Sequence, residues 1–263
     1  MLDDYQNVAM ESAAWDTLPP NYVVEAFTDH IFHEEELVNR LRDYDIVMAM
    51  RERTTLSRSV LKKLPRLKMI STAGMRNAAI DMKAATDLGI LVYGTNGSPR
   101  DTMELTWGLI FALIRNIPDE HIATRMGAWQ KTIGKGLAGS TIGLLGLGRI
   151  GAQMAEVAKA FHMEIIAWSQ NLTEVRASQH NAKLVTKAQL FSQADIISVH
   201  LILSRRTRGL VQLEDLELMR SSSYLVNTSR GPIVDENALI KVLNEGSIAG
   251  VALDVFEPEP LPK

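Results

Sequence analysis

Short apolar runs alternate with amphipathic stretches along the whole chain. This alternation is typical of parallel β-sheets whose strands are connected by helices. In the first part of the chain it predicts four strands, over residues 22–27, 45–50, 67–71 and 90–93. Between them it predicts three helices, near residues 34–42, 56–64 and 82–88. The turn-forming residues 94–99 (Gly-Thr-Asn-Gly-Ser-Pro) then indicate a domain junction.

The second part of the chain begins with a helix expected over residues 102–116, with Pro118 just past its end. On this helix Trp107, Phe111 and Ile114 recur at helical spacing, which indicates either simple packing or a subunit interface. The apolar runs that follow predict five strands, over residues 141–145, 163–168, 196–200, 224–227 and 248–253. Three further helices are expected over residues 149–161, 213–219 and 236–243.

These elements predict an α/β fold of two Rossmann-like or flavodoxin-like domains, each built on a parallel sheet. We expect the first domain over residues 1–96 and the second over residues 97–263. The composition agrees with such a fold, because 263 residues with 46% hydrophobic and 22% charged side chains can bury a sizeable core.

Charge and residue usage exclude several classes of function. The net charge of -3 provides no basic surface, so nucleic acid is not expected as a partner. The chain has no cysteine, which rules out disulfides and cysteine-ligated metals, and no His/Asp cluster has the spacing of metal ligands. The strongest apolar stretch, residues 105–114, is shorter than the ~18 residues of a membrane span, and no signal segment opens the chain. We therefore expect a cytoplasmic protein without a membrane partner.

A glycine pattern in mid-chain predicts a dinucleotide site. Gly146, Gly148 and Gly151 form G-x-G-x-x-G directly after a predicted strand and at the start of a predicted helix, as this mechanism requires. The first glycine permits the tight turn, the second lets the backbone approach a pyrophosphate, and the third allows close packing of helix and strand. The helix start, with Arg149 and Ile150, offers N–H groups and positive charge to the phosphates.

The next predicted strand bears on the choice between NAD and NADP. NAD-binding folds usually place Asp or Glu about 20 residues after the glycine pattern, where it binds the ribose hydroxyls. This chain has Ser169 and Gln170 there. No acid repels a 2′-phosphate and no neighbouring arginine attracts one, so the cofactor is NAD or NADP, with a lean towards tolerance of NADP.

A single arginine at the end of a later strand predicts an anion site. Arg230 closes the apolar run 224–227, and Gly231-Pro232 turn the chain into the next predicted helix. Open α/β folds bind their ligands at this carboxyl edge of the sheet. A planar guanidinium suits a carboxylate better than the point charge of lysine does.

Taken together, these motifs resemble the D-isomer-specific 2-hydroxyacid dehydrogenases along essentially the whole chain. Residues 146–151 resemble the glycine motif of that family, residues 227–231 (Asn-Thr-Ser-Arg-Gly) its arginine motif, and residues 253–259 (Leu-Asp-Val-Phe-Glu-Pro-Glu) its acidic motif. Residues 72–77 resemble the substrate loop of one branch, and residues 200–203 with 207–209 the stretch beneath the cofactor. The resemblance implies a substrate domain followed by an NAD(P)-binding Rossmann domain.

The resemblance also implies roles for individual residues. Arg230 binds the substrate carboxylate and polarises the C2 oxygen, and Glu259, 29 positions later, orients the catalytic histidine. Asp254 contacts the nicotinamide side of the cofactor. The remaining implied cofactor contacts are His200, Thr207, Thr228 and Ser229. The implied substrate contacts in the first domain are Gly74, Met75 and Arg76. The partner implied is a small 2-hydroxy or 2-oxo acid, and a homodimer is the expected assembly.

The departure from the family concerns the general acid/base, a histidine that follows the acidic motif in a Pro-His context. The chain reaches Lys263 before any such residue. None of its six histidines has a matching position: His30, His33, His121, His162, His180 and His200. Residues 1–7 resemble the end of a first strand, and the segment that returns to the substrate domain is missing. We therefore expect a fragment of a longer reading frame, truncated at both ends and itself inactive.

Three hypotheses of function remain open at this point. The first is reversible hydride transfer between C2 of a 2-hydroxy or 2-oxo acid and the nicotinamide. The second is a non-catalytic NAD(P)-binding sensor or corepressor on the same scaffold, which does not need the histidine. The third is a dehydrogenase for another small acid, such as formate or phosphite, which also uses the arginine.

Overall fold

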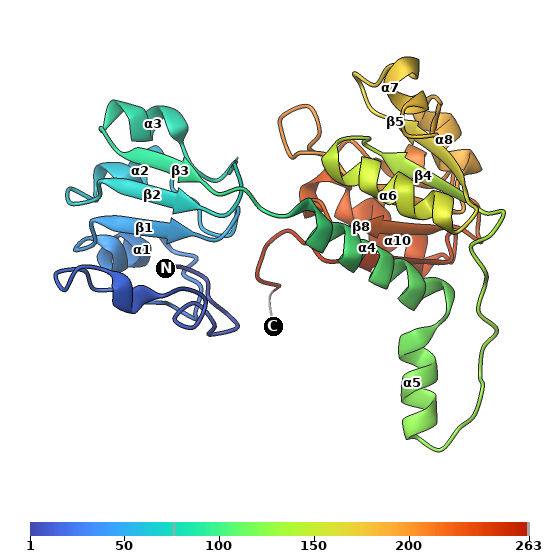
Figure 1. Cartoon of the computed structure of the whole chain (residues 1–263), viewed down its shortest axis with the longest axis horizontal. Coiled ribbons are helices and arrows are strands. Elements are labelled where there is room, and N and C mark those ends of the chain that lie inside the picture. The colour runs from blue at the N-terminus through green and yellow to red at the C-terminus, as the bar shows by residue number, and fades with distance from the viewer. Residues whose placement is uncertain (76, 262–263) are drawn as a thin grey trace. The chain divides into compact units, whose positions relative to one another are not determined.

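The computed structural model describes residues 1–75 and 77–261 of the chain. It divides into two compact units, a first unit of Met1–Gly97 with Pro258–Lys263 and a second unit of Ser98–Glu257. Each unit is an α/β structure on a parallel sheet, as the apolar pattern predicts (Figure 1). Among the described residues no helix is long and apolar enough to cross a membrane.

The first unit is built on three parallel strands in the order β1-β2-β3. The strands are β1 (Ile46–Ala49), β2 (Met69–Thr72) and β3 (Leu91–Gly94). A short 3-10 helix, η1 (Trp15–Thr17), comes first, and the helices are α1 (Glu34–Leu41), α2 (Arg58–Lys62) and α3 (Met82–Asp87). Val47, Ala49 and Ile70 point to the helices and are buried with Leu37, Leu61 and Ala84 in one apolar core.

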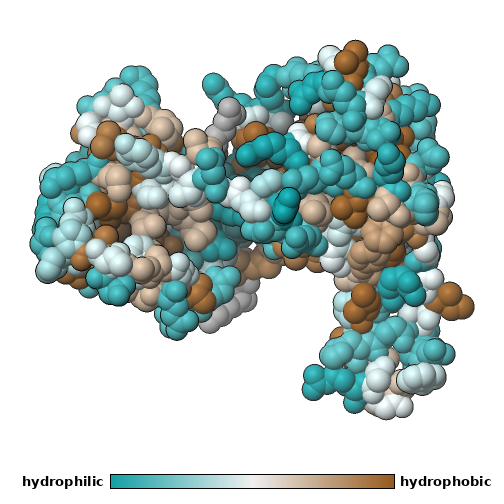
Figure 2. Space-filling view, in the orientation of Figure 1, coloured by the Kyte–Doolittle hydropathy of each residue, from teal (hydrophilic) through white to brown (hydrophobic). Residues whose placement is uncertain are grey.

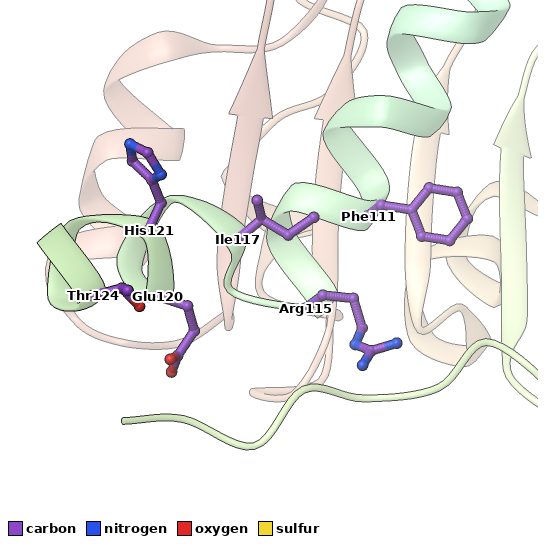
Figure 3. Close-up of a pocket in the computed structure, with 6 residues that line it drawn as sticks. All are labelled: Phe111, Arg115, Ile117, Glu120, His121 and Thr124. Atoms are coloured by element: carbon purple, nitrogen blue, oxygen red, sulfur yellow. The ribbon is translucent and has the colours of Figure 1, made fainter. Parts of the chain in front are cut away.

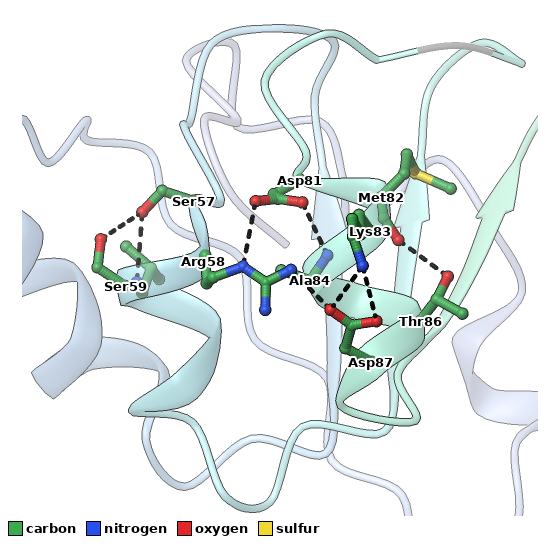
Figure 4. A network of polar contacts seen from close by, with 10 residues as sticks. Ser57, Arg58, Ser59, Asp81, Met82, Lys83, Ala84, Thr86 and Asp87 are labelled. Atoms are coloured by element: carbon green, nitrogen blue, oxygen red, sulfur yellow. Dashed lines mark hydrogen bonds and ion pairs between the residues drawn. The ribbon is translucent and has the colours of Figure 1, made fainter.

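The starts of α2 and α3 are fixed by polar side chains rather than by apolar packing. Ser57 and Asp81 are their N-cap residues, and each accepts a hydrogen bond from a backbone N–H of the first turn. Arg58 on α2 then pairs with Asp81 at 3.9 Å and with Asp87 on α3 at 2.7 Å, which ties the two helices together at the surface (Figure 4). Lys83 reaches Asp87 from the preceding turn, at 3.4 Å.

One face of the first sheet is not covered by helices. The register places Ile46, Met69 and Leu91 in one row across the three strands. Ile46 is 39% and Leu91 58% exposed, and Tyr93 on the same side of β3 is 60% exposed. The space-filling view shows apolar surface gathered over this unit (Figure 2). Burial of β1 and β2 therefore alternates along the strand, although the residues of β1 are all apolar.

The second unit has six parallel strands in the order β6-β5-β4-β7-β8-β9. The strands are β4 (Thr141–Leu145), β5 (Glu164–Trp168), β6 (Lys183–Leu184), β7 (Ile196–Val199), β8 (Tyr224–Asn227) and β9 (Gly250–Leu253). The helices are α4 (Pro99–Ile114), α5 (Ile117–Arg125), α6 (Arg149–Ala160), α7 (Glu174–Ser178), α8 (Lys187–Gln193), α9 (Leu213–Leu216) and α10 (Glu236–Asn244), with the 3-10 helix η2 (Gly231–Ile233). The strand order reverses between β4 and β7, which is the topological switch point of a doubly wound sheet.

Helices cover both faces of this second sheet. Side chains of α4 and α6 form one core with one face, and side chains of α8, α9 and α10 form another with the opposite face. Ile142 and Leu144 of β4 and Ile197 of β7 are 0% exposed. A sheet buried on both faces explains why these strands are continuous apolar runs in the sequence.

The structure differs from the predicted elements in several places. Residues 22–27 do not form a regular strand, although Phe27 exchanges backbone hydrogen bonds with the first residues of the chain. Pro118 lies past the end of α4, as expected, and it also lies in the first turn of α5, a helix that the pattern did not predict. The pattern also gave no prediction of α5, α7, β6 and α8. Trp107 and Ile114 on α4 are buried in the core of the second unit, so the apolar face they share serves packing.

Candidate functional site

The glycine turn after β4 has the backbone geometry of an anion-binding loop. Gly146 has φ of 107°, and a side chain there would place its Cβ 2.4 Å from the carbonyl oxygen of His200. A Cβ on Gly151 would lie 2.2 Å from the carbonyl oxygen of Gly146. A Cβ on Gly148 would meet nothing within 4 Å. Two glycines therefore permit close backbone packing, and the middle one faces open space.

This turn lies at the switch point of the second sheet. The N–H of Gly146 donates to Trp168 of β5 (2.9 Å), and the N–H of His200 donates to Leu145 (2.8 Å), so both neighbouring strands hold the turn. Gly148 is the N-cap of α6 and, as a glycine, provides no side-chain cap. The first-turn N–H groups of α6, which begins with Arg149 and Ile150, are oriented to receive an anion. The arrangement fits a pyrophosphate.

Ser169 and Gln170 follow β5 directly, beside the glycine turn in the sheet order. Ser169 is half-buried and Gln170 is exposed. Neither side chain carries a charge, so the end of β5 offers only hydrogen bonds. This edge of the sheet therefore lacks the carboxylate that usually binds ribose hydroxyls.

His200 follows β7 and is held as a neutral ring. Its Nε2 lies 2.8 Å from the hydroxyl of Ser198, and burial lowers its pKa to about 4. Thr207 lies in the loop beyond, where its hydroxyl donates to the carbonyl of Ile202 (2.6 Å) and accepts from the N–H of Ser204 (2.8 Å). The Thr207 hydroxyl therefore also closes its own loop.

A buried asparagine shapes the turn that carries Arg230. Asn227, at the end of β8, is 1% exposed. Its amide donates to the carbonyl of Arg230 (3.0 Å) and accepts from the N–H of Ser229 (3.0 Å). Arg230 is partly buried, and its guanidinium donates to the carbonyl of Ser229 at 2.6 Å. Thr228 is 3% exposed, and its hydroxyl lies 2.8 Å from that of Thr106 on α4.

Two further contacts fix this turn against the end of β9. A Cβ on Gly231 would lie 2.5 Å from the backbone of Phe256, so only glycine fits after Arg230. The N–H of Asp254 donates to the carbonyl of Asn227 (3.1 Å), which places the exposed Asp254 at the same strand edge as Arg230. The structure therefore brings together the residues that follow β8 and β9.

The remaining predicted site residues belong to the first unit. Gly74 has φ of 92°, and its N–H donates to the hydroxyl of Thr95 (3.2 Å). Met75 is 62% exposed, and Arg76 lies outside the described residues. The side chain of Asn77 anchors this loop, because it donates to the hydroxyl of Thr72 (2.8 Å) and to the carbonyl of Arg51. The loop after β2 therefore presents backbone groups at the carboxyl edge of the first sheet.

Glu259 also belongs to the first unit, where its carboxylate lies 3.9 Å from Nε of Arg53. No sequence motif indicated this contact. No motif assigned a role to Asn227 or Thr106 either, although a polar residue that ends an apolar strand run is a signal that could have identified Asn227.

The hollow in Figure 3 lies elsewhere in the second unit, where α4 meets α5. It is lined by Phe111, Arg115, Ile117, Glu120, His121 and Thr124. None of the predicted site residues lines it. Among the described residues, no group of three or more His, Cys, Asp or Glu side chains could hold a metal ion.

Comparison with known proteins gives consistent matches. The family model described as D-isomer specific 2-hydroxyacid dehydrogenase, NAD binding domain, matches residues 107–263. The chain is 39% identical over 231 residues to D-3-phosphoglycerate dehydrogenase of Methanocaldococcus jannaschii, covering 86% of this chain and 44% of that protein. It is 38% identical over 237 residues to glyoxylate reductase of Aeropyrum pernix, covering 86% of this chain and 70% of that protein.

The same relationship is found among solved structures. A phosphoglycerate oxidoreductase from Vibrio cholerae O395 superposes with a TM-score of 0.92 at 35% sequence identity. That match covers 100% of this chain and 84% of the other. The chain thus spans less than half of one of the longer relatives and most of this solved structure.

Proposed function

Because the chain belongs to the D-isomer specific 2-hydroxyacid dehydrogenases, we propose that it serves hydride transfer between a nicotinamide and C2 of a D-2-hydroxy or 2-oxo acid. The observation that carries this proposal is the placement of Arg230. Its turn follows β8 at the carboxyl edge of the same sheet whose switch point holds the open glycine turn. Arg230 would bind the carboxylate of the acid, and the N-terminus of α6 would bind the pyrophosphate of the cofactor. Both ligands would then be held at one edge of the sheet, where they can react with each other.

The predicted second domain, residues 97–263, would hold the cofactor on its main body, the second unit of Ser98–Glu257, whereas Pro258–Lys263 belong to the first unit. Gly146, Gly148, Arg149, Ile150 and Gly151 would bind the pyrophosphate, and Ser169 and Gln170 the ribose. The residues proposed nearer the nicotinamide are His200, Thr207, Thr228, Ser229 and Asp254. When bound, the nicotinamide supplies the hydride donor or acceptor.

Substrate binding is assigned to Arg230 and to the loop after β2. Arg230 would bind the acid and stabilise negative charge on the C2 oxygen, an electrostatic contribution that is often the largest in catalysis. The N–H groups of Gly74 and Met75, together with Arg76, would bind the carboxylate end, which makes residues 1–96 the substrate domain.

Proton exchange with the C2 oxygen is assigned to a histidine oriented by Glu259. His200 is a poor candidate for that histidine, because a pKa of about 4 leaves it unprotonated at neutral pH. Its hydrogen bond to Ser198 also occupies Nε2. We therefore assign His200 a structural role beside the cofactor.

The test is binding and turnover with the 263-residue chain. We expect it to bind NADH or NADPH, measured by fluorescence, and to reduce glyoxylate and hydroxypyruvate negligibly. Arg230→Lys should abolish binding of glyoxylate to the NADH-loaded chain and leave NADH affinity nearly unchanged. Equal loss of both affinities would move Arg230 from the substrate to the cofactor, and robust turnover would show that the acid/base is already present in this chain.

The second candidate function is a nucleotide-binding sensor or corepressor. It is supported by the same open glycine turn, which requires only a nucleotide as its ligand. It predicts NAD(P)H binding without any measurable affinity for a small 2-oxo acid. A binding screen that includes formate and phosphite separates these two candidate functions from the third, a dehydrogenase for another small acid.

For the cofactor we propose tolerance of both NAD and NADP, because the end of β5 carries Ser169 and Gln170 without a carboxylate. Comparison of NADH and NADPH affinities tests this directly. Ser169→Asp should then lower NADPH affinity about tenfold or more, since the new carboxylate repels the 2′-phosphate.

We further propose that the chain forms a homodimer through α5 and the segment that follows it. No residue of α5 is buried, and Trp129 and Ile133 beyond it are 76% and 96% exposed. This segment is not loose, because the carboxylate of Glu120 accepts from Thr132 N–H (2.5 Å) and hydroxyl (2.7 Å). Sedimentation should give a dimer for the parent chain and a monomer for Trp129→Ser with Ile133→Ser. A monomeric parent chain would contradict the assignment.

A further inference from the structure

Glu257 and Glu259 are neighbouring acids that pair with arginines of different units. Glu257 forms an exposed pair with Arg208 of the second unit, at 2.9 and 3.0 Å. Glu259 belongs to the first unit, where its side chain is 29% exposed and lies 3.9 Å from Nε of Arg53. Of these two acids, only Glu259 is the proposed partner of the acid/base histidine, so the arginine that pairs with Glu259 is the one that bears on the reaction.

Arg53 is largely buried and is held by two contacts besides the one with Glu259. Its guanidinium stacks over the ring of Tyr5 at 4.7 Å from the centroid. One of its terminal nitrogens donates to the backbone carbonyl of Asp3 (3.1 Å). The side chain is only 22% exposed. Arg53 therefore has little rotamer freedom left to lose when it binds a carboxylate.

A buried cluster, made of Asp3, Tyr5, His30 and Thr54, holds that support in place. The Asp3 carboxylate is 2% exposed and accepts from the hydroxyls of Thr54 (2.6 Å) and Tyr5 (3.2 Å). Its other contact is Nδ1 of His30, at 2.7 Å. Asp3 has φ of 60°, which a non-glycine residue adopts only when surrounding contacts enforce it. The Asp3 cluster thus fixes the backbone carbonyl of Asp3, and this carbonyl in turn orients the Arg53 guanidinium.

The Nε of Arg53 takes part in neither of the contacts with Tyr5 and Asp3. It is buried and has no hydrogen-bond partner among the residues that the structure describes. The Glu259 carboxylate lies 3.9 Å from it, within ion-pair but not hydrogen-bond distance. A buried guanidinium N–H is costly unless an acceptor faces it, so the contact favours Glu259 in this position.

We propose that Arg53 is a positioning residue that holds the Glu259 carboxylate on the first unit, with the Asp3 cluster setting the direction of Arg53. The inference rests on the proposed function, because Glu259 matters to the reaction only as the partner of the acid/base. Arg53 itself contacts neither substrate nor cofactor in this role. It acts through Glu259 alone.

The first test observes the pair without reference to activity. In the chain labelled with ¹⁵N-arginine, the Nε–Hε signal of Arg53 is assigned by its loss in Arg53→Lys. Glu259→Gln should shift this signal and speed its exchange with water about fivefold or more, since a pair of this kind limits local opening. Glu259→Asp, which keeps the charge, should retain most of the protection. Glu257→Gln is the matched control, and it should move the Arg208 signal alone.

The second test separates a positioning arginine from a substrate ligand. In the NADH-loaded chain, Arg53→Lys should leave glyoxylate affinity within about twofold of the parent, whereas Arg230→Lys should abolish it. An unmoved Arg53 signal in Glu259→Gln would overturn the pairing. A loss of glyoxylate affinity in Arg53→Lys as large as in Arg230→Lys would make Arg53 a substrate ligand and overturn the positioning role. If no variant and no parent chain binds glyoxylate, the proposed function fails while the signal shift still decides the pairing.

Discussion

The two sheets of this protein share parallel strands but differ in how they are covered. In the second unit, β4 and β7 are buried along almost their whole length, between helices on both faces. In the first unit, β1 and β2 alternate between buried and accessible positions, and β3 has no fully buried residue. The helices α1, α2 and α3 share a core with one face only.

This difference shows that an apolar strand is not by itself a sign of two-sided burial. The run Ile46–Ala49 is entirely apolar, yet Ile46 is 39% exposed and Val47 only 2%. Parallel sheets are usually covered on both faces, and the sequence of β1 has the composition of such a strand. In the second unit the same composition accompanies complete burial, which gives the glycine turn a rigid base.

Core substitutions should separate the two sheets most clearly. Ile197→Ala on β7 removes a side chain that is 0% exposed, and we expect it to lower the free energy of unfolding by about 2–5 kcal/mol. Leu91→Ala on β3 removes one that is 58% exposed and should change it by less than about 0.5 kcal/mol. Urea unfolding followed by tryptophan fluorescence measures both. Equal losses would mean that the exposed face of the first sheet is covered in solution.

Acid should destabilise the second unit through His200. Burial lowers its pKa to about 4 from 6.5, so between these values the unfolded chain binds the proton that the folded chain does not. The contribution of the neutral His200 to the free energy of unfolding is therefore complete above pH 6.5 and is lost as the pH falls towards 4. It amounts to about 3 kcal/mol, because each pKa unit of the shift corresponds to about 1.4 kcal/mol. Thermal unfolding across this range, with His200→Gln as control, measures the effect. A variant with the slope of the parent would assign the acid sensitivity to other groups.

Glycine-to-alanine substitutions should distinguish glycines that leave room for a ligand from glycines that allow close packing of the backbone. A Cβ on Gly148 would meet no protein atom within 4 Å, so Gly148→Ala should fold normally yet lower NADH affinity about tenfold, because the methyl group intrudes on the phosphates. Gly136→Ala, also in open space, should change neither property. In the first unit, a Cβ on Gly94 would lie 2.6 Å from the carbonyl of Gly74, so Gly94→Ala should disturb that loop instead. Unchanged NADH affinity in Gly148→Ala would place the phosphates elsewhere.

The smallest effect is expected on the open face of the first sheet. Leu91→Lys places a charge where the parent side chain is already in contact with water, so the free energy of unfolding should change by less than about 0.5 kcal/mol. Light scattering at high concentration should fall, since the apolar surface is interrupted. A loss above about 2 kcal/mol would show that a partner segment buries this face.

Local sequence determined the parts of the protein whose signals lie within a few residues. The spacing of Gly146, Gly148 and Gly151 predicted a tight turn between strand and helix, and the structure shows that only glycine fits at positions 146 and 151, whereas position 148 faces open space. Continuous apolar runs identified the strands of the second sheet apart from the two-residue β6, and the boundaries of β4 and β8 were predicted to the residue. The site roles of Arg230 and Glu259 were likewise read from local motifs and remain proposals.

Only the tertiary structure decided which face of each sheet is covered and which distant residues meet. The contacts of Asn227 with the Arg230 turn and of Thr228 with Thr106 depend on how β8 and α4 pack. Arg53 and Glu259 lie more than two hundred positions apart in sequence, and no periodicity links them. The physical reason is that secondary structure follows from short-range sterics and hydrophobic pattern, whereas burial and pairing depend on which surfaces the folded chain brings into contact.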